Sequence, residues 1–402
     1  HQRAASKIDD DTPSEPIVTT RSAAAPECSC GEGMMAGVAA GTADQSPARD
    51  VGRAGGTLPF GAVMATGAVS QLSGLAGLPA LQEPLLVLTI VIAVVVTGPG
   101  IARLVRGRRP RPTLVARFGL FTVPVGLAVI AVGLAARSGS GFAGRSGAAF
   151  VVGAIAGVTT VLLTAAVCVA IAKDRPALSA VNGVWFIAPA AFLADAVAAA
   201  ALAARFGPRP EAWFVWIGLA AVTLGTAGYG ALLAVCVARA WAHGLSGAPR
   251  AAWWIVVGCG GLAALALGRV AEAVEAIKSI AAAGISDVAE PGIPHLLDAA
   301  SLTCGIVATI ALVPVAVGSV RFLIRLRRRL VRLPRRLGRA PWPPAFSTGV
   351  YALGCAEVAA TFRSSPVLVL ARIAAVETLV VWVVIAGIHV LGWLRHARTV
   401  AV

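Results

Sequence analysis

Unbroken apolar stretches of about 20 residues, repeated along most of the chain, constrain its fold more than any other feature. A helix needs about this length to cross the hydrocarbon core of a bilayer, whereas the strands of a membrane barrel alternate apolar and polar residues. Only 13% of the 402 residues are charged, which is about half the share found in soluble domains. The sequence therefore predicts an all-α integral membrane protein.

The apolar stretches divide the chain into a polar tail and a membrane domain. Residues 1–56 are rich in Ala, Gly, Ser, Asp and Pro, so we expect them to form a disordered cytoplasmic tail. Residues 57–397 are expected to form a channel or transporter domain of ten transmembrane helices. The predicted helices are Pro59–Leu78, Pro84–Leu104, Val115–Ala136, Ala149–Ala172, Asn182–Ala204, Ala212–Ala238, Ala251–Val270, Leu296–Ile324, Pro343–Phe362 and Val367–Leu394.

The basic residues between these helices predict the orientation of the chain. Lys and Arg gather in every second connection, most densely in the loop at residues 321–340 after the eighth helix. The positive-inside rule places such connections and both termini in the cytoplasm, as in a multi-pass plasma-membrane protein. These loops account for the net charge of +15, so we expect no nucleic-acid partner. The arginines of 321–339 could bind anionic lipid instead.

Motifs that would indicate catalysis or a cofactor are missing or out of context. Gly139–Gly144 reads GxGxxG but lies in a short connection between two apolar segments, without the strand that a dinucleotide site requires. The sequence holds no GxxxxGK[ST], HExxH or GxSxG motif. Cys28 and Cys30 in the tail are better explained by chance than by metal binding, since no ligand spacing accompanies them. We therefore predict no enzyme, no cofactor and no metal site.

Ionisable residues inside the predicted helices are candidates for function, because such groups are costly in hydrocarbon. Asp195 lies near the middle of the fifth helix and has no charged residue at matching depth in the sixth. Glu357 and Arg372 are equally far from the turn that joins the ninth and tenth helices. This symmetry predicts a structural ion pair between them. A transport role for Glu357 is the alternative.

Prolines and one aromatic ring are the other features that could shape a path through the bundle. Pro124, Pro189 and Pro314 lie inside the third, fifth and eighth helices, where a proline removes a backbone hydrogen bond and favours a kink. Phe346 is a large ring near the start of a segment of small residues, Pro341–Phe362. From spacing alone, ordinary packing explains Phe346 more simply than a plug does.

Four stretches in matching order resemble the tellurite-resistance/C4-dicarboxylate transporter family, which includes bacterial tellurite-resistance channels, fungal malate permeases and plant slow anion channels. They are Pro59–Gly67 (PFGAVMATG), Val181–Phe186 (VNGVWF), Pro249–Ile255 (PRAAWWI) and Trp342–Leu353 (WPPAFSTGVYAL). They resemble the beginnings of the family's first, fifth, seventh and ninth helices. Together they make residues 57–397 similar to the whole membrane domain of that family.

The resemblance implies five helical hairpins around a central pore that is lined by the odd-numbered helices. It implies a phenylalanine gate on the ninth helix, for which Phe346 is the matching residue. We take Phe60, Gly61, Pro124, Pro189, Asp195 and Gly349 as further candidates along the pore. The expected substrates are C4-dicarboxylates, chloride, nitrate, or oxyanions such as tellurite and sulfite. The family also suggests a homotrimer.

Two departures from the family pattern keep other functions open. Ser347 stands where the family usually has proline, and Asp195 places an acid where bacterial relatives have an uncharged stretch. A carboxylate would repel an anion unless it were protonated, which makes a proton-coupled dicarboxylate carrier an alternative. A membrane sensor or scaffold that uses the 321–339 loop is another. A transporter predicts a continuous wet path between the odd-numbered helices, whereas a scaffold predicts a packed interior.

Overall fold

The computed structural model describes residues 58–105, 114–137, 143–176, 181–206, 208–243, 250–281, 292–327 and 342–400, all within the compact unit Pro47–Val402. The predicted tail at 1–56 and residues 328–340 of the predicted basic loop lie outside the described residues. All regular structure in the described ranges is helical, which confirms the predicted all-α class.

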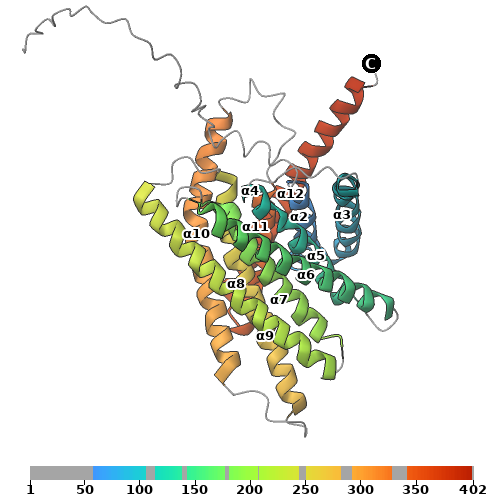
Figure 1. The fold of residues 1–402 in the computed structure, drawn as a ribbon, viewed down its shortest axis with the longest axis vertical. Helices are drawn as coiled ribbons and strands as arrows, with labels where there is room; N and C mark the ends of the chain where they lie inside the picture. The colour runs from blue at the N-terminus through green and yellow to red at the C-terminus, as the bar shows by residue number, and fades with distance from the viewer. Residues whose placement is uncertain are drawn as a thin grey trace, which may run out of the picture. The chain divides into compact units, whose positions relative to one another are not determined.

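The order of the helices follows the predicted segments closely (Figure 1). With α4 and α5 counted as one helix, the described residues form ten long helices, as predicted. Eight helical segments are long and apolar enough to cross a membrane, and the shorter α2 and the more polar α11 are not among them. The helices are α2 (Leu58–Leu72), α3 (Gln82–Val105), α4 (Leu114–Leu120), α5 (Thr122–Ala136), α6 (Ala143–Asp174), α7 (Ile187–Ala203), α8 (Pro208–His243), α9 (Arg250–Ala281), α10 (Gly292–Arg327), α11 (Pro343–Thr361) and α12 (Ser365–Val400), with short 3-10 turns η1 (Pro79–Leu81) and η3 (Gly183–Phe186).

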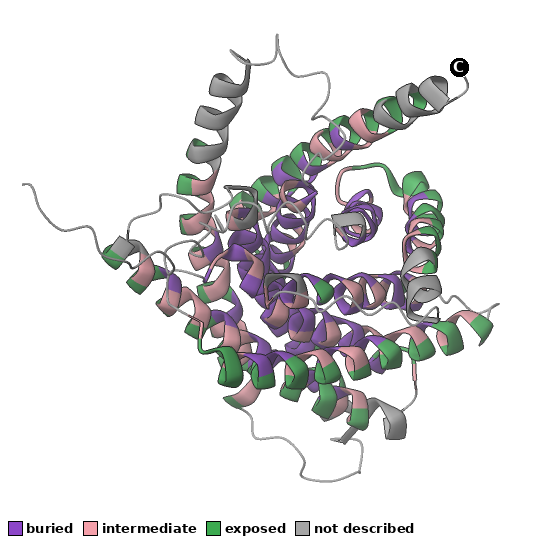
Figure 2. Ribbon diagram, turned by 45° about the horizontal axis from the view of Figure 1, so that its top comes forward, coloured by how far each residue is buried: buried purple, intermediate pink, exposed green. Residues whose placement is uncertain are grey.

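Five helices pack against one another in a closed cycle, in the order α2, α5, α7, α9, α11 and back to α2. We call these the inner helices. Each of α3, α6, α8, α10 and α12 packs on the inner helix that precedes it in the chain. The first four also pack on the inner helix that follows, and α12 packs on α2. Of the residues in the most apolar part of each helix, 94% are buried in α9 and 78% in α7, against 11% in the outer helix α10. Figure 2 shows the buried residues in purple on the faces that turn inward.

Two of the three prolines mark a change of helix geometry near the start of an inner helix. Pro124 has no N–H to donate to the carbonyl of Leu120, and the helix predicted as one piece is interrupted at Phe121, between α4 and α5. Pro189 lies in the first turn of α7, directly after η3. Pro314 remains inside α10 without interrupting it. The two buried prolines thus shorten the inner helices α5 and α7 at their N-terminal ends.

The crossing of α9 and α11 brings two backbones into contact. A Cβ added to Gly261 would lie 2.5 Å from the Cα of Tyr351, and one added to Gly354 would collide with the carbonyl oxygen of Gly261. Small residues permit this approach, as they do between other membrane helices. The crossing has no layer of side chains that could be repacked, so it fixes α11 against α9.

Candidate functional site

Two adjoining cavities lie among the inner helices. The larger one, which we call the wide cavity, has a volume of about 580 Å³. The smaller one, the narrow cavity, has a volume of about 20 Å³, which is room for about one water molecule. They adjoin because both are lined by the same five residues: Gln71, Val132, Val197, Leu265 and Leu353.

The narrow cavity is enclosed by all five inner helices. Its wall includes one or more apolar residues from each of them, with Gln71 as the polar exception. The apolar lining residues are Ala68 of α2, Val125, Val129 and Val132 of α5, Ala194 and Val197 of α7, Leu262 and Leu265 of α9, and Phe346, Val350 and Leu353 of α11. A cavity with this lining offers an ion almost nothing to replace its hydration shell.

Phe346 lies in the first turn of α11, where its ring forms part of the narrow cavity. Pro343 and Pro344 open this helix and suit a first turn, since their missing N–H groups would have no helical partner there. The ring is 4% exposed, and its neighbours Ala345 and Ser347 are fully buried. Phe346 is therefore both a packed residue and a cavity-lining one, so its role as a gate remains a prediction.

The wide cavity is polar at the C-terminal ends of four inner helices. Arg137 directly follows α5, Arg205 follows α7 by two residues, and Arg269 lies in the C-terminal half of α9. Gln71 of α2 and Glu272 of α9 complete its inner-helix polar lining, and Gln82 adds to it from the start of α3. The two cavities thus form a column with arginines at its wide end and apolar residues at its narrow end.

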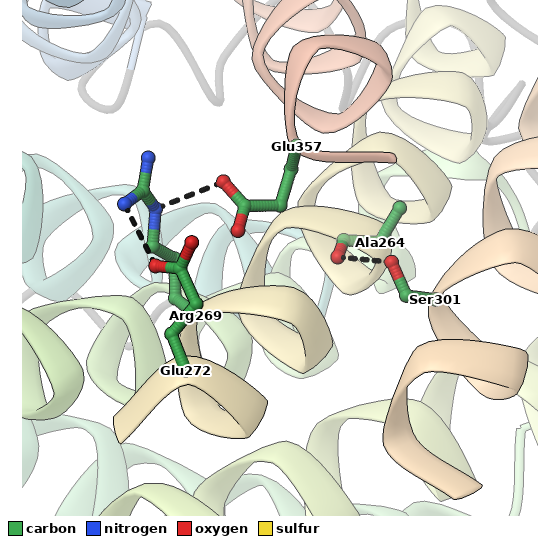
Figure 3. A network of polar contacts seen from close by, with 5 residues as sticks. All are labelled: Ala264, Arg269, Glu272, Ser301 and Glu357. Atoms are coloured by element: carbon green, nitrogen blue, oxygen red, sulfur yellow. Dashed lines mark hydrogen bonds and ion pairs between the residues drawn. The ribbon is translucent and has the colours of Figure 1, made fainter. Parts of the chain in front are cut away.

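Glu357 forms an ion pair with Arg269, which lines the wide cavity (Figure 3). Its Oε2 lies 3.0 Å from Nε of Arg269, and Nη1 of Arg269 donates to Oε2 of Glu272 over 3.0 Å. Glu357 is 3% exposed, whereas the Arg269 side chain is 50% exposed. The other carboxylate oxygen of Glu357 is buried without a hydrogen-bond partner among the described residues.

The structure thus gives Glu357 a different partner from the one predicted. Arg372 is exposed on α12, while the carboxylate of Glu357 points to α9. The symmetry of the α11–α12 hairpin predicts only the depth of a residue, and the rotation of each helix decides which neighbour it faces. A glycine makes this contact possible, because a Cβ on Gly268 would lie 2.5 Å from Cγ of Glu357.

Arg137 and Arg205 form hydrogen bonds with residues near the C-terminal ends of inner helices. Arg137 donates to the carbonyl oxygen of Gly133 and to the hydroxyl of Ser70, each over 3.2 Å. Arg205 donates to the carbonyl oxygen of Ala136 over 3.0 Å. Partial burial lowers the pKa of Arg137, a shift that nearby Glu83 opposes and Arg145 reinforces. The guanidinium nevertheless stays protonated at neutral pH, as arginine does in proteins.

Several predicted pore residues pack between helices instead of lining either cavity. Phe60 belongs to a buried cluster with Val63, Ala93 and Ile130. A Cβ on Gly61 would lie 3.0 Å from Cβ of Trp342, so the absence of a side chain at Gly61 lets the N-terminal end of α11 pack closely against α2. The remaining three are also buried in the packing: Pro124 in α5, Pro189 in α7, and Gly349 between α2 and α12.

Asp195 faces α6 and lies outside the lining of both cavities. Its carboxyl group lies near the hydroxyl of Thr160, which donates to the carbonyl oxygen of Ala156 over 3.1 Å. The carboxyl oxygen Oδ1 is buried without a hydrogen-bond partner among the described residues. The neighbouring Ala194 and the nearby Val197 line the narrow cavity instead, because successive residues of a helix point in directions about 100° apart.

The arginines of the wide cavity were not predicted as site residues, although the sequence carries a signal for them. Arg137 and Arg205 directly follow the predicted third and fifth helices, in connections that the charge pattern places outside. Basic residues are depleted on that side, so an arginine there needs a separate explanation. No group of three or more His, Cys, Asp or Glu side chains in the described part of the chain could hold a metal ion.

A comparison with protein families covers most of the chain. Residues 58–390 match the family described as SLAC1, voltage-dependent anion channel. A comparison with curated proteins finds no matching relative. The matched range runs from the start of α2 almost to the end of α12, so it includes both cavities.

Proposed function

The chain belongs to the voltage-dependent anion channel family, and we propose that it conducts small anions along the column formed by its narrow and wide cavities. Membership confirms the resemblance carried by the four sequence stretches and makes the chain a multi-pass membrane protein of a non-enzymatic transport family. The observation that carries the proposal is that every inner helix contributes to the wall of the narrow cavity. We propose that five hairpins, each an inner helix with its outer partner, surround this column.

The narrow cavity is the proposed point of closure, and Phe346 is the proposed gate. The valines, leucines and ring that line it leave room for about one water molecule. An anion would lose most of its hydration there without receiving hydrogen bonds in return, which is costly. Apolar constrictions of this kind close a channel by excluding water. A change of the Phe346 rotamer would widen the constriction without moving a helix.

Replacing Phe346 by Ala tests the gate. The variant should conduct constitutively in planar bilayers, with weak selectivity among chloride, nitrate and C4-dicarboxylates, because removing the ring enlarges the narrow cavity. Phe186→Ala is a matched control, since Phe186 is fully buried against Tyr229 and lines neither cavity. The control should lose about 3–5 kcal/mol of stability without gaining conductance. A folded Phe346→Ala protein with unchanged conductance would disprove the gate.

The proposed substrates are small anions, namely chloride, nitrate, C4-dicarboxylates, and oxyanions such as tellurite or sulfite. Flux of each anion into liposomes that contain the purified protein would rank them. The wide cavity has room for a C4-dicarboxylate as well as for an inorganic ion, so the constriction rather than the mouth should decide the ranking. We expect larger anions to gain the most from Phe346→Ala.

A proton-coupled dicarboxylate carrier is the second candidate, supported by the unpartnered buried oxygen of Asp195. If protons accompany the anion, flux should depend on the pH gradient across the liposome membrane. Asp195→Asn keeps the size of the side chain and its contact with Thr160 while removing the titratable group. In a carrier this variant should retain flux but lose its dependence on the gradient. In a channel, neither protein should respond to the gradient.

A further inference from the structure

Arg137 places in the wide cavity a positive charge that has no ion-pair partner within the described residues. The hydrogen bonds of Arg137 go to a carbonyl oxygen and a hydroxyl, neither of which is charged. Glu83, the acid that raises the pKa of Arg137, forms its own ion pair with Arg145 over 3.0 Å. Two of the five N–H groups of Arg137 serve these bonds, and a guanidinium has no other means of neutralising its charge.

Arg269 lines the same cavity but has two carboxylate partners. Glu357 accepts from its Nε and Glu272 from its Nη1, both over 3.0 Å. Glu357 cannot turn away easily, because its Cγ sits against Gly268 at a point where α9 and α11 leave no spare space. Arg269, Glu272 and Glu357 therefore form a fixed group with no positive excess, which we call the charge cluster.

We propose that the wide cavity is an anion-binding vestibule in which Arg137 supplies an uncompensated positive charge, while the charge cluster is part of its structural wall. A concave site with low-dielectric walls focuses such a charge and raises the local concentration of anions. A small inorganic anion or a carboxylate would bind beside Arg137 while still partly hydrated. This adds a site that attracts anions to the proposed conduction path. Binding at Arg137 does not depend on that path, but passage of the bound anion through the protein rests on the proposed function.

Reaction rates of charged thiol reagents can measure the potential in the cavity without any transport. Ala204 lines the cavity one residue before Arg205, whose guanidinium bonds the carbonyl of Ala136 next to Arg137. In an Ala204→Cys protein, the rates of an anionic and a cationic methanethiosulfonate would be compared by mass spectrometry of the peptide that carries residue 204. Any change in thiol reactivity affects both reagents alike and cancels in the ratio of their rates.

The expected result is a ratio that favours the anionic reagent and falls when Arg137→Gln is added. For unit charges about 6 Å apart in water, removing one of them changes each rate by about threefold in opposite directions, so the ratio should fall by about tenfold. The effect should vanish near 1 M salt, where charges are screened within about 3 Å. Arg372→Gln, on the exposed face of α12, should leave the ratio unchanged.

The charge cluster provides the decisive comparison. The double variant Arg269→Gln/Glu357→Gln removes one positive and one negative charge and keeps side chains that can hydrogen-bond, so the ratio should stay within about twofold. An unchanged ratio in Arg137→Gln, or an equally large fall in the double variant, would overturn the proposal. Because the reagents need only reach the cavity, a failure of Phe346→Ala to conduct would count against the gate and leave this result intact.

Discussion

At the scale of single residues, Glu357 shows how a buried charge is maintained in an apolar bundle. Its carboxylate is almost fully buried and pairs with a half-exposed guanidinium on α9 that also binds Glu272. Removing one partner of a buried pair leaves the other charge without compensation, and this costs more than removing both. The side chain of Arg269 therefore matters chiefly as the partner of Glu357.

Variants of this pair should reveal the coupling. Arg269→Gln should lower the free energy of unfolding by about 1–3 kcal/mol, because it leaves a buried carboxylate poorly satisfied. The double variant Arg269→Gln/Glu357→Gln should be more stable than Arg269→Gln alone. Arg372→Gln should change stability by less than about 0.5 kcal/mol, as surface substitutions do. Thermal unfolding in detergent measures all three, and strong coupling of Glu357 to Arg372 would contradict the pairing.

Residues of the site divide into those that the sequence reveals and those that depend on helix rotation. Hydropathy alone marked Glu357 as a charge that needs a partner, and the family resemblance selected Phe346, which does line the narrow cavity. The partner Arg269 and the orientation of Asp195 toward Thr160 follow from rotations of α9 and α7 that no local pattern specifies. For the same reason Phe60 and Gly349 were expected along the pore and instead pack between helices.

At the scale of helices, boundaries are predictable where hydropathy decides them. The predicted segment Pro84–Leu104 nearly coincides with α3, whereas the predicted Ala251–Val270 ends eleven residues before α9 does. Glu272 and Glu275 end the apolar run, but α9 continues because both side chains remain exposed. The break between α4 and α5 follows from Pro124, although its place at Phe121 depends on packing.

The α9–α11 crossing gives a prediction about glycine. Gly261→Ala should lower stability by about 1–3 kcal/mol, because the new methyl group meets the backbone of Tyr351, which cannot rotate away. Gly157→Ala in α6 is the control, since open space surrounds that position, and alanine there should be neutral or favour the helix by up to about 1 kcal/mol. Equal melting temperatures for the two variants would show that the crossing tolerates a side chain.

Aromatic residues on α8 mark the thickness that this helix spans. Trp213 and Trp216 are exposed near its start and Trp241 near its end. At 1.5 Å per residue, Trp213 and Trp241 lie about 40 Å apart along the axis. This is close to the thickness of a bilayer with its headgroup regions, where tryptophan is enriched. We therefore expect α8 to cross the membrane with little tilt.

At the scale of the whole molecule, orientation connects the loop charges with the cavities. The wide cavity lies at the C-terminal ends of α2, α5, α7 and α9, which the positive-inside rule directs to the outer face. We therefore propose that it opens outward, that both termini are cytoplasmic and that the protein lies in the plasma membrane. Homotrimer formation remains a proposal that native mass spectrometry can test.

Labelling of intact cells checks this orientation. A membrane-impermeant maleimide should label Ala204→Cys from outside, because Ala204 is exposed in the wide cavity. Lys173→Cys, at the exposed end of α6, should be labelled only after the cells are permeabilised. The wild-type protein gives the background from its own cysteines. The opposite pattern would invert the proposed topology and place the wide cavity toward the cytoplasm.

The backbone contact between Gly261 and Gly354 also has a consequence for the timing of gating. A translation of α11 along α9 would have to separate two backbones in contact, and such helix shifts take microseconds to milliseconds. A rotation of the Phe346 ring needs only space beside it, and the narrow cavity adjoins it. Rotation of the ring should therefore open and close the wild-type channel in brief events that broaden its current noise. The dwell times should change little when α11 is crosslinked to α9.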